Sequence, residues 1–272
     1  GGIDMTDKRW DTRDHKEDDP RRKTPRGQPY TPWHDATMMM EGEVAKALAD
    51  LGGDRWTRAG GGELPEVEDG PGNPWPDALT AQFENVEIGI ARTRAAYRDW
   101  DAVDEIEQLY LQHIGRAKRF IYAESQYFAS RSIAEAIIER LGENDPPEIV
   151  IVHPCHADGW LEQQAMDHAR AELVRAIQEA DTKGRFTIWS PLTGATPIYV
   201  HAKIMVVDDE VLRIGSANLN NRSMGLDSEC DVFIDATRPG NEHAREGIAA
   251  LRHSLLAEHC GLEPKEGPEL LE

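Results

Sequence analysis

Beyond residue 82, apolar positions along the chain alternate between two periods. Short, largely apolar runs predict strands, and stretches with apolar residues at helical spacing predict helices between them. The expected strands are 86–91, 120–122, 148–152, 186–189, 200–207, 211–214 and 230–234. The expected helices are 104–117, 130–141, 159–180 and 241–259. Strands that alternate with helices of this length predict a layered α/β fold with a mixed, largely parallel sheet.

Before residue 83 the pattern is weaker. Residues 36–41 predict a short strand with Met38-Met39-Met40 in a core, and 43–51 predict a helix that stops at Gly52-Gly53. Residues 60–76 are rich in Gly, Pro and acidic side chains, as in a linker.

Two charged segments are expected at the surface. Residues 12–32 hold many charges and prolines, which predicts a solvated loop whose cluster Arg21-Arg22-Lys23 neutralises acidic neighbours. The tail from Gly261 is acidic, contains proline and is expected to fray.

Composition narrows the function class. The 30 Lys and Arg against 50 Asp and Glu give a net charge of −20, which argues against a general nucleic-acid binder. The 3 cysteines (Cys155, Cys230 and Cys260) form no C-x-x-C pair, which excludes a disulfide scaffold and a Cys-rich zinc module. The sequence contains no apolar run of about 18 residues, so it predicts no membrane-spanning helix. The start Gly1-Gly2-Ile3-Asp4 has neither an initiator Met nor a signal-peptide pattern, so we expect a segment of a longer protein, of unknown location.

One segment combines the residue types of phosphoryl chemistry. His201 and Lys203 lie two residues apart on an expected strand, so their side chains leave the same face. A reversal at Asp208-Asp209-Glu210 and a return strand bring the loop Gly215-Ser216-Ala217-Asn218 beside them. Imidazole can attack or protonate, while ammonium and carboxamide groups can hold phosphate oxygens. Each part alone is usually structural, but the joint spacing is a strong signal.

This spacing resembles the second signature of the phospholipase D superfamily, H-x-K-x4-D-x6-G-S-x-N. Other stretches are similar to further motifs of that family, in the same order. They are GGIDMT and RWD within 1–11, PWHD at 32–35, IYAESQYF at 121–128, NRSM at 221–224 and DSE at 227–229. The resemblance covers nearly the whole chain, and it favours phospholipase D over the cardiolipin synthase and nuclease relatives.

The resemblance implies a phospholipase D-like α/β/α sandwich whose first half is truncated. Residues 1–58 are then a remnant of that half, 59–82 a linker, 83–260 the second half with the motif, and 261–272 an acidic tail. Two His-x-Lys motifs build one site in this family, and this sequence contains one. We expect the other from the missing N-terminal half of its own chain or from a homodimer, although a truncated first half makes symmetric pairing less favourable.

The same resemblance implies two-step phosphodiester transfer through a phosphohistidine, with no metal or other cofactor. The expected substrate is a phospholipid at a membrane or micelle surface, hydrolysed to phosphatidate and a free head group or transferred to an alcohol. In the family the first-motif histidine is generally the nucleophile, which makes His201 the general acid and base. Lys203 and Asn218 then bind phosphate oxygens.

Other site residues follow from the same resemblance. Glu229 is a candidate to hydrogen-bond a catalytic imidazole and fix its tautomer. Asp208 belongs to the catalytic motif, although it is expected to brace the turn rather than touch substrate. Ser216, Gly215 and Gln126 are expected to contact substrate.

Some acidic and metal-ligating residues receive a weaker assignment. Asp4 stands where the second motif has Asn218, and Asp11 is expected to orient a histidine. A group after the strand 148–152 is interpreted as a loop at the edge of the sheet rather than a metal site, because it lacks a second ligand set. This group is His153, Cys155, His156 and Asp158.

Two alternative functions fit the same residues. One is a cardiolipin-synthase-like phosphatidyltransferase or a nuclease of the same superfamily, although the acidic composition and the lack of hydrophobic helices argue against these. The other is a catalytically incomplete chain that serves as an interaction module.

Overall fold

The computed structural model describes residues 3–65, 75–155 and 160–271. Its internal contacts divide the chain into one unit of Gly1–Thr37 with Asn85–Glu272, and another of Met38–Glu84. The assignment of 1–58 to a first-half remnant stays a prediction. No described helix is long and apolar enough to cross a membrane.

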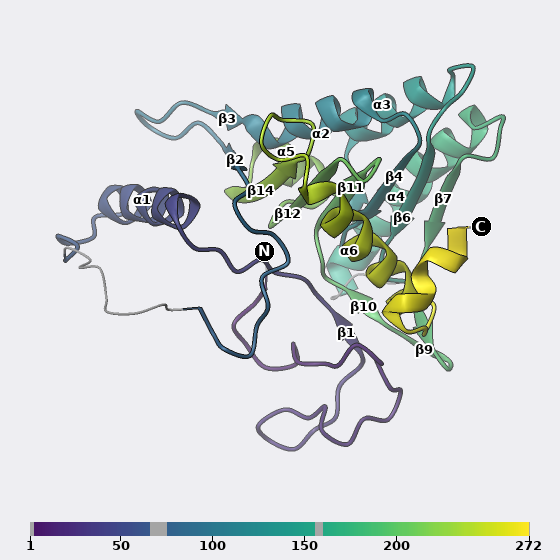
Figure 1. Ribbon diagram of the computed structural model, residues 1–272, viewed down its shortest axis with the longest axis horizontal. Helices are drawn as coiled ribbons and strands as arrows, with labels where there is room; N and C mark the ends of the chain where they lie inside the picture. Colours follow the sequence, from purple (N-terminus) through teal and green to yellow (C-terminus); the bar gives the residue numbers. More distant parts are fainter. Residues whose placement is uncertain (1–2, 66–74, 156–159, 272) are drawn as a thin grey trace. The chain divides into compact units, whose positions relative to one another are not determined.

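The larger unit is built on an eight-stranded sheet in the order β3-β2-β14-β12-β11-β4-β6-β7 (Figure 1). Its strands are β2 (Ile88–Arg94), β3 (Val103–Asp104), β4 (Phe120–Glu124), β6 (Glu148–Val152), β7 (Phe186–Trp189), β11 (Ile204–Val207), β12 (Val211–Gly215) and β14 (Glu229–Asp235). The predicted α/β fold with a mixed sheet is confirmed. Strands β2, β4, β6, β7 and β12 point the same way, but adjacent parallel pairs occur only within β4-β6-β7.

Among the described residues, three two-stranded pairings lie outside this sheet. They are β1 (Trp33–His34) with β10 (Tyr199–Val200), β5 (Phe128–Ala129) with β13 (Leu219–Asn220), and β8 (Leu192–Thr193) with β9 (Thr196–Pro197). The first two are parallel, and each joins segments far apart in the sequence.

Helices cover both faces of the sheet, as the alternation of side chains along β4 requires. Ile121 and Ala123 belong to the apolar core with α2 (Glu105–Arg116), α3 (Arg131–Leu141) and α4 (Trp160–Ala180). Glu124, whose side chain leaves the opposite face of β4, contacts His259 of α6 (Ala244–His259), which lies on that face (Figure 1). Two short helices complete the unit, α5 (Asn221–Gly225) and the 3-10 helix η1 (Pro264–Leu271).

The predicted strand at 36–41 is wrong. No described strand pairs with this segment, and Met39 is 46% exposed rather than in a core. The helix predicted at 43–51 is α1 (Glu43–Arg58), which continues through Gly52-Gly53. Two interior glycines cost about 1 kcal/mol each but do not end a helix unless the backbone leaves helical geometry. No residue of α1 is buried.

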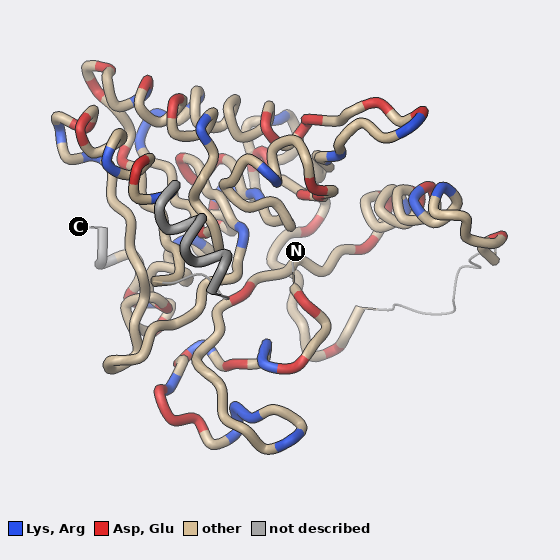
Figure 2. Tube along the Cα trace, turned by 180° about the vertical axis from the view of Figure 1, so that it is seen from behind, with Lys and Arg blue, Asp and Glu red and all other residues tan. Residues whose placement is uncertain are grey.

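The prediction of a solvated loop at 12–32 is wrong for Arg22, although Arg21 is exposed and pairs with its acidic neighbour Asp19 as predicted. Arg22 is 2% exposed, and it donates to the Asp11 carboxylate and to three backbone carbonyl oxygens. The loop is therefore folded around a buried guanidinium. Acidic and basic residues are interspersed along the chain, as Figure 2 shows.

The described part of the C-terminal tail is not frayed. Residues 264–271 form η1, which packs against α6. An added Cβ at Gly267 would lie within 3 Å of the His253 backbone, so the tail approaches the helix closely.

Asp208 braces the turn between β11 and β12 from the end of β11 opposite His201. Asp208 and Asp209 both have positive φ, 55° and 56°, as a tight hairpin turn requires. The Asp208 carboxylate accepts hydrogen bonds from the backbone N–H groups of Lys118, Arg119 and Phe120 at 2.7, 2.8 and 2.9 Å. This placement ties the turn to the start of β4 and gives Asp208 a structural role.

Replacing Asp208 by Ala should destabilise the fold by about 3 kcal/mol or more, because three charge-assisted hydrogen bonds are lost together. Urea unfolding of the two proteins measures this difference. Asp145→Ala, at an exposed turn, is the matched control and should stay within about 0.5 kcal/mol of the parent. A loss as small as that of the control would contradict the bracing role.

Close packing of β12 against β14 requires glycine at position 215. A Cβ there would lie 2.6 Å from the Asp231 Cα and overlap the Asp231 carboxylate. That carboxylate accepts from the N–H of Ala217 at 3.1 Å and pairs with the fully buried Arg213. Gly215 therefore lets a buried ion pair support the loop 216–218.

Gly215→Ala should cost about 1–3 kcal/mol, as overpacking of a filled interior does, and should displace the loop that follows. Thermal or urea unfolding, with the chemical shifts of Ser216 and Asn218, reports both effects. Gly225→Ala is the control, because an added Cβ at Gly225 meets nothing within 4 Å. Equal effects of the two substitutions would contradict this packing argument.

Candidate functional site

The motif residues lie where the chain changes sheets. The predicted strand 200–207 is interrupted, since β10 pairs with β1 and only β11 belongs to the main sheet. His201 and Lys203 occupy the connection between them. The backbone N–H of His201 donates to the His34 carbonyl at 2.8 Å, and that of Gly215 donates to the Lys203 carbonyl at 3.1 Å. The connection is therefore fixed from both sides.

His201 is oriented by a carboxylate. Its Nδ1 lies 2.8 Å from Oδ2 of Asp35, and both side chains are about nine-tenths buried. Burial opposes ionisation of Asp35, but the hydrogen bond from His201 and the charge of Lys203 outweigh it and lower the pKa of this carboxyl. An ionised Asp35 holds the proton on Nδ1, so Nε2 is the nitrogen available for proton transfer.

Lys203 is a buried ammonium beside this pair. It is 3% exposed, and its Nζ donates to the His201 carbonyl oxygen. Burial lowers the pKa of Lys203 to about 8, although Asp35, Asp4 and Glu229 favour its charged form. His201 and Lys203 thus both interact with Asp35.

Glu229 organises the loop after β12. Its carboxylate accepts hydrogen bonds from the hydroxyls of Ser216 and Ser223 at 2.5 and 2.7 Å. Burial raises the pKa of Glu229, and the two hydroxyls partly offset this effect. In the described residues its hydrogen bonds thus go to hydroxyls, while Asp35 binds the imidazole of His201. A bond from Glu229 to another imidazole stays a prediction.

Asn218 is held by its backbone and its amide oxygen. Its N–H donates to the Ser223 hydroxyl at 3.0 Å, and its Oδ1 accepts from the Ser125 hydroxyl at 3.3 Å. A carboxamide whose oxygen is engaged presents its NH2 group as a donor. Ser216, Ser223, Glu229 and the backbone of Asn218 are therefore linked by hydrogen bonds, and Lys203 interacts electrostatically with Glu229.

Aromatic rings form a wall beside His201. Trp33 stacks on Tyr199 with ring centroids 4.6 Å apart and lies 5.2 Å from the His201 ring. The guanidinium of Arg9 lies 4.0 Å from the Trp33 ring. Gln126 donates to the Tyr199 hydroxyl at 2.9 Å, which places this predicted substrate contact at the edge of the wall.

The two acidic residues near the N-terminus, Asp4 and Asp11, lie in different surroundings. Asp4 pairs with Arg9 at 3.0 Å and interacts with Lys203, so it lies at the site. Asp11 does orient a histidine, but this histidine is His15, whose Nδ1 lies 3.0 Å away, and not His201. Asp11 is thus part of a buried network that adjoins the site through the Trp33 N–H, which donates to Asp11 at 2.9 Å.

Sequence reasoning gave Asp35 no role, although it stands in the quoted segment Pro32-Trp33-His34-Asp35. The one sequence feature that could have pointed to Asp35 is its place, as an acidic residue, in a segment that resembles a motif of the family. The neighbouring network was missed as well, apart from the expectation that Asp11 orients a histidine, because its members come from distant segments. They are Asp11, His15, His34, Glu124, Glu258 and His259.

Two groups in this network could bring ligand atoms to a metal ion. They are His15, His34 and Glu258, and His34, Glu124 and His259. In both groups the histidine nitrogens are hydrogen-bonded to carboxylates, at 2.6 to 3.2 Å. A metal ion would have to displace protons from His34, so the donor set favours ion pairing over coordination.

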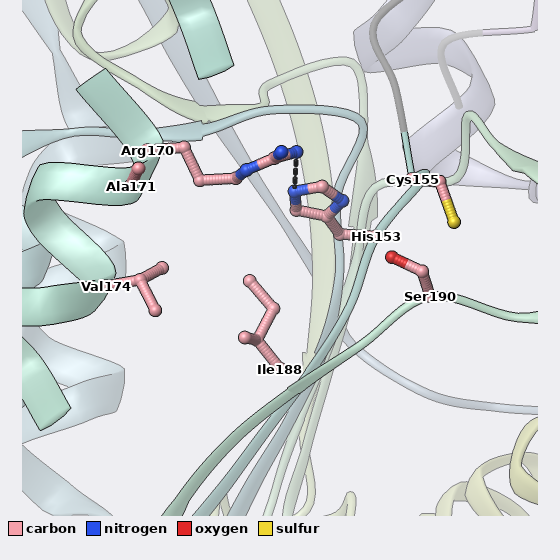
Figure 3. Close-up of a pocket in the computed structure, with 7 residues that line it drawn as sticks. All are labelled: His153, Cys155, Arg170, Ala171, Val174, Ile188 and Ser190. Atoms are coloured by element: carbon pink, nitrogen blue, oxygen red, sulfur yellow. Dashed lines mark hydrogen bonds between the residues drawn. The ribbon is translucent and has the colours of Figure 1, made fainter. Parts of the chain in front are cut away.

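A cavity of about 230 Å³ lies at the ends of β6 and β7, beside α4 (Figure 3). Arg170 Nη1 lies 2.6 Å from His153 Nε2, so a guanidinium occupies the position that a metal would need on this nitrogen. Cys155 lines the same cavity, whereas His156 and Asp158 lie outside the described residues. The edge-of-sheet interpretation of this group stays a prediction.

Known proteins resemble this chain over much of its length. Phospholipase D alpha 1 of Arabidopsis thaliana is 25% identical over 369 aligned positions, covering 96% of this chain and 46% of that protein. Phospholipase D alpha 1 of Brassica oleracea var. capitata is 26% identical with the same coverage. The chain thus spans about half the length of these curated relatives.

Two solved structures are similar at lower levels. Phosphatidylserine synthase of Haemophilus influenzae Rd KW20 gives a TM-score of 0.48 at 15% identity, covering 86% of this chain and 52% of that one. The phospholipase D family member Nuc of Salmonella typhimurium gives 0.39 at 15% identity, covering 60% and 90%.

The family model described as "Cardiolipin synthase, PLD-like domain" matches residues 110–249, which include β4, the whole His-x-Lys-x4-Asp hairpin and Glu229. This match covers half of the chain, and it confirms the resemblance that the motif spacing indicated. The chain belongs to the PLD-like domain family of the phospholipase D superfamily.

Proposed function

We propose that this chain supplies the second catalytic motif of a phospholipase D-type phosphodiesterase that acts on phospholipids through a phosphohistidine. The observation that carries the proposal is the buried His201–Asp35 pair with Lys203 beside it. A carboxylate that fixes the imidazole tautomer leaves Nε2 to exchange a proton, which is the requirement for general acid and base catalysis.

The proposed steps divide between two histidines. The partner histidine, from a His-x-Lys motif outside these 272 residues, attacks phosphorus and breaks the bond to the head-group oxygen. His201 gives its Nε2 proton to that leaving oxygen, and then takes a proton from the water that releases phosphatidate. Lys203 and the Asn218 amide hold the phosphate oxygens, whose negative charge the ammonium stabilises.

Glu229 is proposed to face the partner histidine, as Asp35 faces His201. Its carboxylate interacts with Lys203 and is held by Ser216 and Ser223, so it lies among the motif residues. Phospholipid is favoured as substrate because the phospholipase D relatives align over 96% of the chain.

The first test measures choline release from phosphatidylcholine micelles by the chain extended upstream to include a His-x-Lys-x4-Asp motif. His201→Asn should lower turnover by about 10²–10⁴-fold, and Asp35→Asn by a similar factor with KM little changed, because both disturb proton transfer rather than binding. Asp145→Asn, at an exposed turn, should retain the parent rate.

Each other result has a definite meaning. Turnover by the 272-residue chain alone, abolished in His201→Asn, would place the partner histidine on a second copy. Formation of a new phosphodiester with an alcohol in place of free phosphatidate would indicate a phosphatidyltransferase, and cleavage of an oligonucleotide a nuclease. Turnover that survives His201→Asn would contradict the proposal, and no turnover at all would favour an interaction module.

Anion binding tests Lys203 independently of turnover. Sulfate, whose charge is constant over this range, should bind about tenfold more weakly near pH 9 than near pH 7, because the ammonium loses its proton as pH rises through the Lys203 pKa of about 8. Calorimetric titration measures the affinities. Lys203→Met should bind weakly at both pH values, whereas the exposed Lys183→Met should behave as the parent does. A pH-independent parent affinity would exclude Lys203 as the anion ligand.

A further inference from the structure

The side chain of His34 lies between two carboxylates. Its Nδ1 is 2.9 Å from Oε1 of Glu258, and its Nε2 is 2.6 Å from Oε2 of Glu124. An ionised carboxylate only accepts hydrogen bonds, so each ring nitrogen must carry a hydrogen. The geometry therefore describes an imidazolium, and His34 is 3% exposed.

Both carboxylates are surrounded by further donors, which keep them ionised. Glu258, on α6, accepts from Arg13 at 2.7 Å and lies 3.2 Å from Nε2 of His15. Glu124, on β4, lies 3.1 Å from Nε2 of His259 and accepts from the Tyr122 hydroxyl.

The electrostatic balance agrees with this description. Burial opposes the imidazolium, but Glu124 and Glu258 outweigh it and raise the pKa of His34 to about 10. Burial likewise opposes ionisation of Glu258, but the hydrogen bonds from His15 and His34 lower its pKa to about 2. The pKa of Glu124 is lowered for the same reason, by His34 and His259.

The network extends away from His34 through the N-terminal loop. His15 lies between Glu258 and Asp11, and Asp11 pairs with the buried Arg22. Residues of the N-terminal loop, β4 and α6 thus all contact His34 or its direct partners. The strand that contains His34 is thereby tied to three elements by charge.

This strand and the residue that follows it carry both partners of the His201 contact. The His34 carbonyl accepts the His201 N–H at 2.8 Å, and the next residue, Asp35, binds the His201 ring at 2.8 Å. β1 consists of only two residues, too few for its ladder alone to fix the segment. The ion pairs of the His34 ring add a restraint to the stacking of Trp33 on Tyr199 and to the hydrogen bond from the Trp33 N–H to Asp11 at 2.9 Å.

We propose that His34 is a positioning residue, an imidazolium clamped by Glu124 and Glu258 that fixes β1 so that Asp35 meets His201. The consequence for catalysis rests on the proposed function, whereas the state of His34 does not. By this inference Glu258, 57 residues beyond the motif histidine in α6, acts on the site through His34.

The test is a pH titration of the histidine ring nitrogens by NMR on the ¹⁵N-labelled 272-residue chain, assigned with His34→Gln. Near pH 8.5, where ordinary histidines are neutral, both ring nitrogens of His34 should remain protonated. Nδ1 of the His201 ring, which faces Asp35, should carry a hydrogen. Titration of His34 together with ordinary histidines would overturn the proposal without any variant.

Glu258→Gln should lower the pH at which His34 titrates by at least about one unit, and should shift and broaden the His201 Nδ1 signal. Glu258→Asp keeps the charge and should leave His34 protonated near pH 8.5. Glu246→Gln, on an exposed position of the same helix, should change neither ring. If Glu258→Gln moves His34 but leaves the His201 ring unchanged, the clamp exists and positions nothing.

These readouts separate the two proposals. Absence of choline release would not alter the nitrogen spectra, so the clamp is judged independently of the enzyme. Conversely, sulfate binding by Lys203 does not require His34 to be protonated, and it stands if the clamp fails.

Discussion

The parallel pairing of two residues, Trp33–His34, with Tyr199–Val200 is the interaction on which the site depends. It places the Asp35 carboxylate against the His201 imidazole. It also pairs β10 with β1, so β10 is not part of the main sheet. Since so short a ladder contributes little by itself, the stacking of Trp33 on Tyr199 and the charges around His34 hold it in place. The geometry around His201 is therefore maintained by residues outside the signature motif.

Burying these charges has two opposing effects on the free energy of folding. The desolvation of His34, Glu124 and Glu258 opposes folding, and their mutual attraction repays it only while every partner is present. Such a network adds little net stability compared with an apolar core of the same volume, but removing one member leaves an uncompensated charge. In this structure the network links β1, β4 and α6 through the pairing of His34 with Glu124 and Glu258.

Local periodicity predicted much of the larger unit, and it did so for a physical reason. The strand at 148–152 and the helix at 130–141 bury regular apolar faces, and Ser130 caps that helix with its hydroxyl. Met38-Met39-Met40 misled because three apolar residues make a strand only beside a partner, and none is described there. Gly52-Gly53 misled because glycine permits a helix end but does not impose one.

In the candidate site, too, local features could be predicted and long-range contacts could not. The spacing of His201, Lys203 and Asn218 is local and could be predicted, whereas Asp35 could not be assigned, because its contact joins positions 166 residues apart. Arg22 looked like a surface cation because a sequence does not reveal which carbonyl groups will surround a guanidinium.

That separation of 166 residues also bears on the order of folding. The β11–β12 hairpin closes through a tight local turn at Asp208-Asp209, and contacts of this kind form early at small entropic cost. The His201–Asp35 contact closes a loop of most of the chain, a cost that grows with loop length and is offset only when the surrounding charges pair. We therefore expect the hairpin to form before the His201–Asp35 contact, so that the carboxylate reaches the motif histidine late in folding.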